Sequence, residues 1–240
     1  MKKKQAENDR AAMSLFEHLE ELRQRLIRVI IALLVGVLVG MFVAEPVIAI
    51  LVAPLTELGI KVQAIKLTES LSVFFRVAVV VGVVLAMPVI TYQMFQFAAP
   101  GLESRERRYV LIGAPFASLS FAAGVVFAVF VLLPRALPFL MGFMDDIIEN
   151  RPHIEAYLST VSNILLWSGL VFETPLVMYF LAKLGVIDAQ GFAKVWRVVV
   201  IGAAVGAAVI TPTVDPVSML LVMAPFLLLY GLGILLARLA

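Results

Sequence analysis

The chain has 240 residues, of which 62% are hydrophobic and only 15% are charged. A soluble domain is about half apolar and about a quarter charged, so the long apolar runs of this chain indicate an integral membrane protein with helical spans. The net charge of +2 is too small to indicate nucleic-acid binding, and the absence of cysteine excludes disulfides and thiolate metal sites. Strand-period alternation is absent, which argues against an outer-membrane barrel.

The chain begins with a polar segment, which we interpret as a retained cytoplasmic tail, residues 1–26. Ser14 is a candidate helix cap, with Glu17 three residues on as its capping-box partner. Leucines then recur at helical spacing, at Leu15, Leu19, Leu22 and Leu26. This pattern predicts an amphipathic helix that lies at the membrane interface and continues into the first span.

Residues 27–240 are predicted to form one transmembrane domain of six helices. The first span covers about 27–44 and exits at Glu45-Pro46, and a long outer connection follows over 45–70. The second span covers about 71–95, with Pro88 predicted to kink it. The third covers about 110–133, and we expect prolines and a glycine to break it up beyond that, namely Pro134, Pro138 and Gly142.

The last three spans are predicted over about 154–184, 195–210 and 217–237. The uncharged part of the fifth, 198–210, rises only about 20 Å, against a hydrocarbon core of about 30 Å. The fifth and sixth helices are therefore expected to be short. We expect the bilayer to thin locally around them.

The distribution of basic residues predicts the orientation of the chain. With six spans, 14 of the 19 lysines and arginines fall on the side of the two termini, and five fall on the other. Cytoplasmic loops collect lysine and arginine, so both termini are predicted to be cytoplasmic.

The loop between the second and third spans carries a carboxylate without an obvious local partner. Glu106 has Leu102, Glu103, Tyr109 and Val110 at the positions three and four residues away, and none of these is cationic. A free carboxylate at a membrane surface is a candidate for binding a cation. A solvated loop charge explains it about equally well. For Glu21 in the tail, an i,i+4 pair with Arg25, worth about 0.3–0.5 kcal/mol, is the simpler explanation.

Glu173 is the most unusual residue, because a charge within a span costs about 2.5–3.5 kcal/mol on insertion scales. We expect it to line a polar cavity. A hydrogen bond to Thr174 or Ser168 is the structural alternative, and proton uptake is a less favoured one. Asp215, in the turn before the sixth span, has a structural alternative too, as the cap of that helix with Pro216 at its first position.

Several segments together resemble the TatC family, the multispan receptor subunit of the twin-arginine protein translocase. They occur in the family's order across nearly the whole chain: His18-Leu-Glu-Glu-Leu-Arg-Gln-Arg-Leu26, Ala53-Pro-Leu55, Met87-Pro-Val-Ile-Thr-Tyr-Gln93, Phe97-Ala-Ala-Pro-Gly-Leu-Glu-Ser-Arg-Glu-Arg-Arg108, Phe172-Glu-Thr-Pro175 and Ile210-Thr-Pro-Thr-Val-Asp-Pro216. Each segment alone is weak evidence, and the set is highly specific.

The resemblance implies a receptor in the cytoplasmic (inner) membrane of a prokaryote that recognises Arg-Arg signal peptides on folded cargo. It also implies assembly with the single-span subunits TatA and TatB, self-association in a larger complex, and transport driven by the proton motive force. The residues that match the family's signal-peptide site are Glu21, Arg23, Phe97, Pro100, Leu102 and Glu106. Glu173 matches an intramembrane acid, and the region where a partner helix docks corresponds to Thr211, Asp215 and Met219.

Other function classes are less well supported. Phosphate-loop, nucleophile-elbow and zinc-protease motifs are absent, and His18 and His153 are too far apart in the topology to form a metal pair. We therefore expect no enzyme activity, no cofactor and no metal site. The alternatives to a receptor are a proton-coupled small-molecule transporter that uses Glu173, and a scaffold for other membrane helices.

Overall fold

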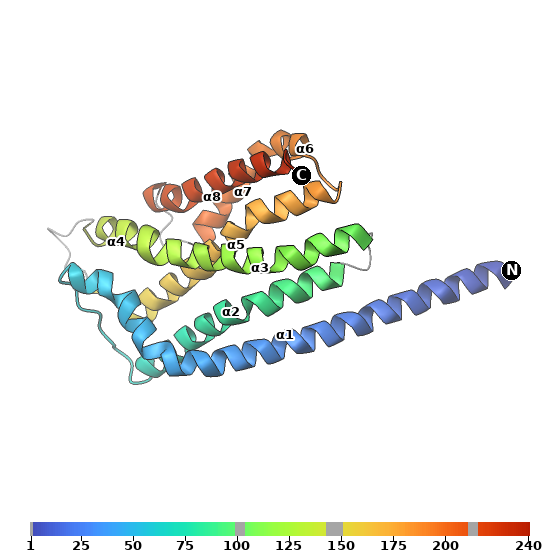
Figure 1. Cartoon of the computed structure of the whole chain (residues 1–240). Coiled ribbons are helices and arrows are strands. Elements are labelled where there is room, and N and C mark those ends of the chain that lie inside the picture. Colours follow the sequence, from blue (N-terminus) through green and yellow to red (C-terminus); the bar gives the residue numbers. More distant parts are fainter. Residues whose placement is uncertain (1, 99–103, 143–150, 211–215) are drawn as a thin grey trace.

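The computed structural model describes residues 2–98, 104–142, 151–210 and 216–240, and every structural statement below concerns these ranges. Helices make up most of them, and the only β-type pairing found there is an isolated bridge between Gln63 and His153. The elements, shown in Figure 1, are α1 (Lys2–Glu57), α2 (Glu69–Ala98), α3 (Ser104–Phe127), the π-helical turn η2 (Ala128–Leu132), α4 (Leu133–Gly142), α5 (Ile154–Lys183), α6 (Ala189–Lys194), α7 (Trp196–Ile210) and α8 (Pro216–Ala237).

The predicted class of an all-α membrane protein is confirmed. Five helical segments within the described ranges are long and apolar enough to cross a bilayer, and α7 is a shorter apolar helix, consistent with six spans. With 15 residues, α7 is about 22 Å long. Both α7 and the 22-residue α8 are shorter than α2 and α5, which have 30 residues each.

The helix does not stop at Glu45-Pro46, where the first span was predicted to exit, because α1 continues through Pro46 and Pro54 to Glu57. A proline removes one backbone hydrogen bond from a helix, and packing compensates for that loss here. Leu51 and Leu55, on the continued segment, are almost completely buried in the main core. The Tyr157 hydroxyl of α5 also donates a hydrogen bond to the carbonyl oxygen of Leu51, at 2.6 Å.

The third span also extends further than predicted. Its helix passes through the π-turn η2 and continues as α4 to Gly142, although Pro134 and Pro138 lie in α4. A π-turn is one of the recognised causes of a helix irregularity, and η2 ends two residues before Pro134. Leu133 and Leu137 of α4 are buried in the core. The helix therefore continues past both prolines.

Close packing of α1 on α2 builds the first layer of the bundle. A Cβ atom added to Gly36 would lie 2.5 Å from the carbonyl oxygen of Gly82, so the two backbones are nearly in contact. Beyond this pair, α1, α2, η2, α4 and α5 share one core of buried aliphatic side chains. A second, smaller cluster joins α5, α6 and α8 around Met178, Phe192 and Tyr230.

The connection after α1 is attached to the start of α5. The backbone N–H of Gln63 donates to the carbonyl oxygen of Pro152 at 3.1 Å, and that of Ile154 donates to the carbonyl oxygen of Gln63 at 3.0 Å. The Glu69 carboxylate, buried at the start of α2, accepts from the backbone N–H groups of Ile65 and Lys66 at 2.5 and 3.2 Å. This connection therefore packs against the bundle.

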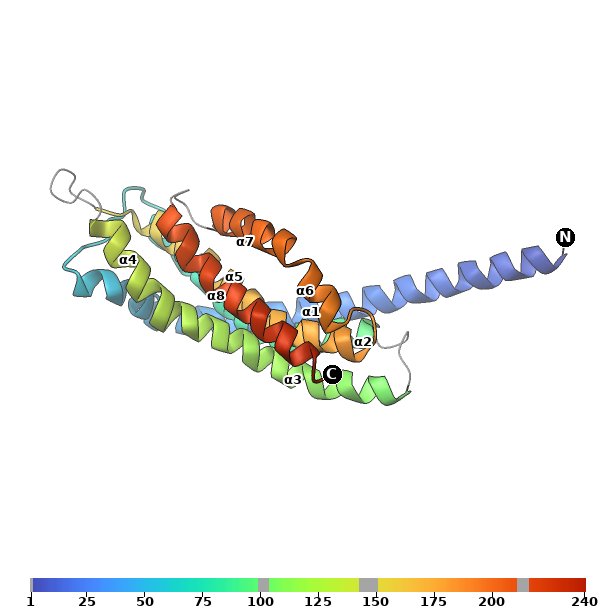
Figure 2. The same ribbon diagram turned by 90° about the horizontal axis from the view of Figure 1, so that it is seen from above.

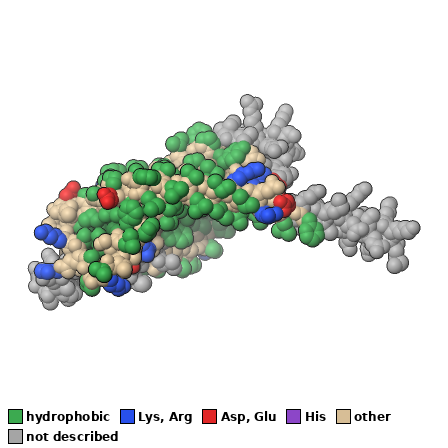
Figure 3. All heavy atoms as spheres, turned by 90° about the horizontal axis from the view of Figure 1, so that it is seen from below, with side chains coloured by type: hydrophobic (Ala, Val, Ile, Leu, Met, Phe, Trp, Pro, Cys, Tyr) green, Lys and Arg blue, Asp and Glu red, His purple; other side chains and the backbone are tan. Residues whose placement is uncertain are grey.

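The two termini lie at the same end of the bundle, together with the end of α2 and the start of α3 (Figure 1). The first part of α1 extends beyond the other helices at that end (Figure 2). On the face shown in Figure 3, apolar side chains cover the middle, and acidic and basic side chains gather toward the two ends. This distribution is what a bilayer around the middle of the bundle requires.

Candidate functional site

The candidate site lies where the first part of α1 meets the last turn of α2. The rings of His18 and Phe97 stack with their centroids 4.3 Å apart and an interplanar angle of 22°. Two turns further along α1, Arg25 Nη1 donates to Oε1 of Gln93 at 3.4 Å. Residues 18 and 25 share a helix face, as do residues 93 and 97, so these two contacts fix the register of one helix on the other.

Glu21 lies on α1 between these two contacts. Its Oε1 accepts a 3.1 Å hydrogen bond from Arg25 Nε and a second bond from Arg25 Nη2, which together form an ion pair. The i,i+4 pair expected from the sequence is thus present. The side chains keep 31% (Glu21) and 15% (Arg25) of their exposure, and no described side chain donates to the second carboxylate oxygen, Oε2. Glu21 is therefore oriented through one oxygen while the other remains available.

The other predicted site residues are placed less completely. Arg23 pairs at 3.4 Å with Glu20 on the exposed surface of α1, so its described ion pair does not involve Glu21. Glu106 lies in the first turn of α3, and its side chain is outside the described part of the structure. Pro100 and Leu102 also lie outside the described residues. The structure therefore places Glu21 near Phe97, through the contacts of Arg25 with Gln93 and of His18 with Phe97. The role of Glu106 in this site stays a prediction.

Two further residues of this site, His18 and Gln93, lie in segments that carry the family resemblance but were not predicted to belong to the site. Gln93 is only 7% exposed although it is polar, and it accepts the hydrogen bond from Arg25. The available signal was its i,i+4 spacing from Phe97, which places both side chains on one face of α2. That spacing could not show which helix this face contacts.

Glu173 lies in α5, two residues before Pro175. Its Oε1 atom is buried, and within the described ranges it has no hydrogen-bond partner. Neither Thr174 nor Ser168 therefore holds this oxygen, and the expected structural alternative is absent for it. A buried carboxylate oxygen without a partner is costly, which marks Glu173 as a functional candidate and not a stabilising residue.

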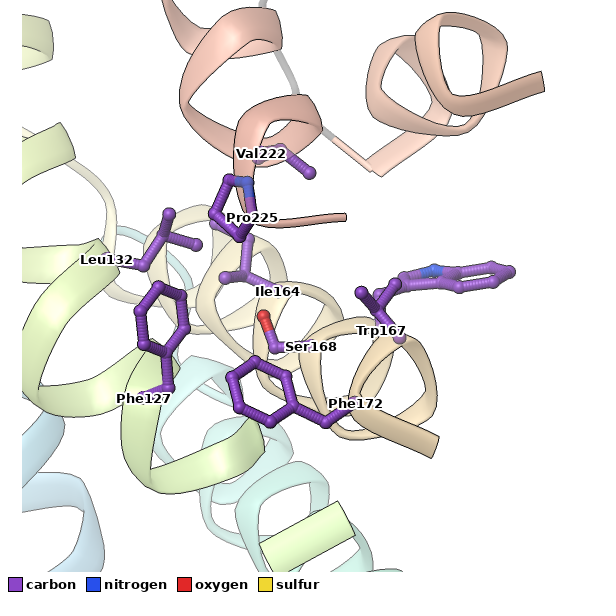
Figure 4. A pocket seen from close by; sticks show the side chains of 9 residues that line it. Phe127, Leu132, Ile164, Trp167, Ser168, Phe172, Val222 and Pro225 are labelled. Atoms are coloured by element: carbon purple, nitrogen blue, oxygen red, sulfur yellow. The ribbon is translucent and has the colours of Figure 1, made fainter. Parts of the chain in front are cut away.

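A small cavity of about 20 Å³ lies beside α5, between η2 and α8. Figure 4 shows the Ser168 hydroxyl directed into it, with Phe127 and Phe172 beside it and Pro225 opposite. Glu173 is not one of its lining residues. A cavity of this size holds about one water molecule, so it provides no site for a solute, and the cavity expected around Glu173 stays a prediction.

The predicted partner-docking residues are only partly covered by the structure. Met219 lies in the first turn of α8 and is half-buried. Thr211 and Asp215 lie outside the described residues, as does the alternative cap formed by Asp215. Docking of a partner helix at this turn therefore stays a prediction.

Known proteins resemble this chain over nearly its whole length. The sequence model of the family described as "Sec-independent protein translocase protein (TatC)" matches residues 17–225. A protein of that name from Carboxydothermus hydrogenoformans is 38% identical over 226 residues, covering 94% of this chain and 93% of the relative. Another from Deinococcus radiodurans is 38% identical over 244 residues, covering 98% and 89%. The crystal structure of a "Twin Arginine Translocase Receptor- TatC" superposes with a TM-score of 0.83 at 35% identity, covering 92% of this chain and 98% of that one.

Proposed function

This chain belongs to the TatC family of Sec-independent protein translocase proteins, and from that premise we propose that Glu21, together with Glu106, binds the arginine pair of a signal peptide. The family assignment makes the chain a membrane-embedded subunit of the twin-arginine translocase, whose function is protein transport. The proposal concerns the residues that recognise the cargo.

The observation that carries the proposal is the geometry of Glu21. Its carboxylate is partly exposed at the end of the bundle, is held through Oε1 by Arg25, and has Oε2 free of described donors. A guanidinium ion offers a planar fork of donors that matches a carboxylate, whereas an ammonium ion acts as a point charge. An oriented carboxylate therefore favours arginine over lysine.

A pair of arginines calls for two carboxylates, and Glu106 supplies the second in this proposal. The start of α3 and the end of α2 lie at the same end of the bundle as the first part of α1 (Figure 1). Phe97, Pro100 and Leu102 would line the peptide between the two acids, with Arg23 at the edge. Phe97 is already held against the α1 helix by the His18 ring, which supports this arrangement.

The remaining parts of the proposal concern the assembly. Both termini are cytoplasmic, the membrane is the inner membrane of a prokaryote, and the chain works with TatA and TatB under the proton motive force. The turn at Thr211, Asp215 and Met219 receives a partner helix, and copies of the chain associate in a larger complex. The unpartnered oxygen of Glu173 supports a role for this acid in the assembled translocase.

The proposal is tested by reversing the charge of both acids, Glu21→Lys with Glu106→Lys. Export of a folded reporter carrying a twin-arginine signal should be abolished, and crosslinking of that signal to positions 97–108 should be lost, while the protein remains inserted in the membrane. A matched control reverses two neighbouring acids in the same segments, Glu20→Lys with Glu103→Lys, and should retain most of the crosslinking.

Normal export by the Glu21/Glu106 double variant would refute the assignment of these two residues. The small-molecule transporter alternative makes a different prediction. It expects solute flux in vesicles that contain this protein alone, whereas a translocase subunit should be inert there without its partners.

A further inference from the structure

A polar pocket of about 400 Å³ lies at the end of the bundle away from the candidate site. It is formed by the connection after α1, the start of α2 and the start of α5, and its charged and polar lining residues are Lys66, Glu69, Arg76, His153, Glu155 and Ser159. The proposed receptor function does not use this pocket, and its lining combines cationic side chains with a hydroxyl group.

Arg76 lies at an unusual depth for a charged residue. It follows the first residue of α2 by seven positions, or about 10 Å along the helix. A 30-residue helix is about 45 Å long, and it exceeds the hydrocarbon core of about 30 Å by roughly 7 Å at each end if it is centred. Arg76 is therefore expected at the boundary between acyl chains and headgroups, where a cation is stable if it reaches an anion.

The described structure supplies Arg76 with a single acceptor. Nη1 donates to Ser159 Oγ at 2.8 Å, and the side chain is otherwise exposed. A guanidinium group has five N–H donors, so most of them are left for a ligand. Ser159 lies five residues into α5, about 7 Å from its start, and thus at a similar depth.

The two glutamates of the pocket, Glu69 and Glu155, leave hydrogen-bond donors of Lys66 and Arg76 available to a ligand. Glu69 is held by two backbone N–H groups. Lys66 Nζ forms an ion pair with Glu155 Oε2 at 3.8 Å, a distance too long for a hydrogen bond, and the lysine side chain is 74% exposed. Lys66 and Arg76 therefore both face the pocket with unused donors.

The rim of the pocket is apolar and faces outward. Ile65 and Leu67, which flank Lys66 in the chain, are 66% and 101% exposed. Leu71 and Phe75 continue this exposed apolar surface onto α2. Two exposed apolar side chains on either side of a lysine suit the surface of a bilayer, where the apolar groups meet acyl chains and the cation meets phosphates.

We propose that this pocket binds the phosphate of a glycerophospholipid from the leaflet at that end of the bundle. Arg76 and Ser159 hold the phosphate from within the pocket, and Lys66 holds it from above. The acyl chains lie along the apolar rim formed by Ile65, Leu67 and Phe75. The bound lipid joins the connection after α1 to the start of α5, beside the Gln63–Ile154 hydrogen bond.

The test measures binding of dihexanoyl phosphatidylglycerol to the full-length protein in a non-ionic detergent by native mass spectrometry. One saturable lipid should bind the unchanged protein. Arg76→Gln and Lys66→Gln should each weaken this binding about tenfold, because each removes a charge-assisted contact to phosphate worth about 1.4 kcal/mol. Arg135→Gln is the matched control: Arg135 lies on α4, outside the pocket, with Nη1 bonded to the carbonyl oxygen of Val131, and its variant should bind as the unchanged protein does.

Three further probes identify what the pocket recognises. Inorganic phosphate and glycerol phosphate, which lack chains, and dihexanoylglycerol, which lacks phosphate, should all bind at least tenfold more weakly than the phospholipid. Equal binding of inorganic phosphate would overturn the proposal in favour of a soluble-anion site, and equal binding of dihexanoylglycerol would overturn it in favour of apolar contact alone. If Arg76→Gln does not fold, the exposed Lys66 decides, and unchanged binding in Lys66→Gln refutes the proposal.

Discussion

Arg25 connects the two helices that form the candidate site, because its guanidinium group donates both to Glu21 on α1 and to Gln93 on α2. The sequence indicated the pair with Glu21 from spacing alone. It did not indicate Gln93, which is 68 residues away in the chain. From the sequence, the Arg25–Glu21 ion pair is explained by helix stabilisation alone. In the fold, the same pair is part of the candidate site.

We predict that Arg25→Gln weakens binding of a twin-arginine signal peptide about fivefold. The Glu21 side chain regains rotamer freedom when its partner is removed, and ordering it again costs about 1 kcal/mol. Arg28→Gln makes the same charge change one turn further along α1, where no contact of the side chain is described, and should leave affinity nearly unchanged. The measurement is a peptide titration with both variants. Tighter binding by Arg25→Gln would show that Arg25 competes with the signal peptide for Glu21.

Two glutamates in the bundle have opposite surroundings. Glu69 is 3% exposed and accepts two backbone N–H bonds. Glu173 has a buried Oε1 without a partner in the described structure. Removing a satisfied acceptor leaves donors unpaired, whereas removing an unsatisfied one relieves a cost.

We predict that Glu173→Leu raises the thermal unfolding temperature of the purified protein and that Glu69→Leu lowers it. For Glu173 the relief should be about 1–3 kcal/mol, the cost of one unpaired buried polar group. Parallel melting curves in one detergent check both variants. A lower unfolding temperature for Glu173→Leu would mean that Oε1 accepts a stabilising hydrogen bond in the folded protein.

At the scale of elements, the prolines were misleading. Glu45-Pro46 was expected to mark the exit of the first span, and Pro134 to break up the third, because proline lacks an N–H donor and breaks helices in isolation. In the fold, buried leucines on the far side of each proline, such as Leu51 and Leu137, keep the helix in place. Long apolar periodicity predicted α5 and α8 to within about a residue, since no packing partner is needed to recognise a membrane-length run.

The contact between α1 and α2 depends on glycine at the point of closest approach. We predict that Gly36→Ala destabilises the protein by about 1–3 kcal/mol, because the added methyl would lie 2.5 Å from the Gly82 carbonyl oxygen and the helices must separate. Gly202→Ala, on α7 with no atom within 4 Å of the added methyl, is the matched control and should be neutral or stabilising, by up to about 1 kcal/mol. Chemical or thermal unfolding in detergent distinguishes them, and equal stabilities would show that α1 and α2 are not held this closely.

For the whole molecule, the termini, the end of α2 and the start of α3 lie at one end of the bundle, and the connection after α1 lies at the other (Figures 1 and 2). The excess of lysine and arginine on the side of the termini predicts which end faces the cytoplasm. Because the chain has no cysteine, single cysteines give an unambiguous readout of this orientation.

We predict that Thr68→Cys reacts with a membrane-impermeant maleimide in intact cells, and that Ser104→Cys reacts only after the cells are opened. Thr68 is exposed in the connection after α1, and position 104 begins α3 at the opposite end. The reverse pattern would invert the topology and place both candidate acids outside the cell, where they could not meet a signal peptide before export.

The sequence by itself determined the class of the protein, its six apolar segments and the family to which it belongs, because membrane-length hydrophobicity and ordered motifs are local properties of a chain. It also singled out Glu106 and Glu173 as acids in unusual settings, and Glu21 through the family resemblance. Only the tertiary structure decided that His18 stacks on Phe97, that Arg25 reaches Gln93, and that Lys66 and Arg76 line one pocket. These contacts join residues far apart in the chain, and they depend on which helix faces meet, which spacing along a single helix does not specify.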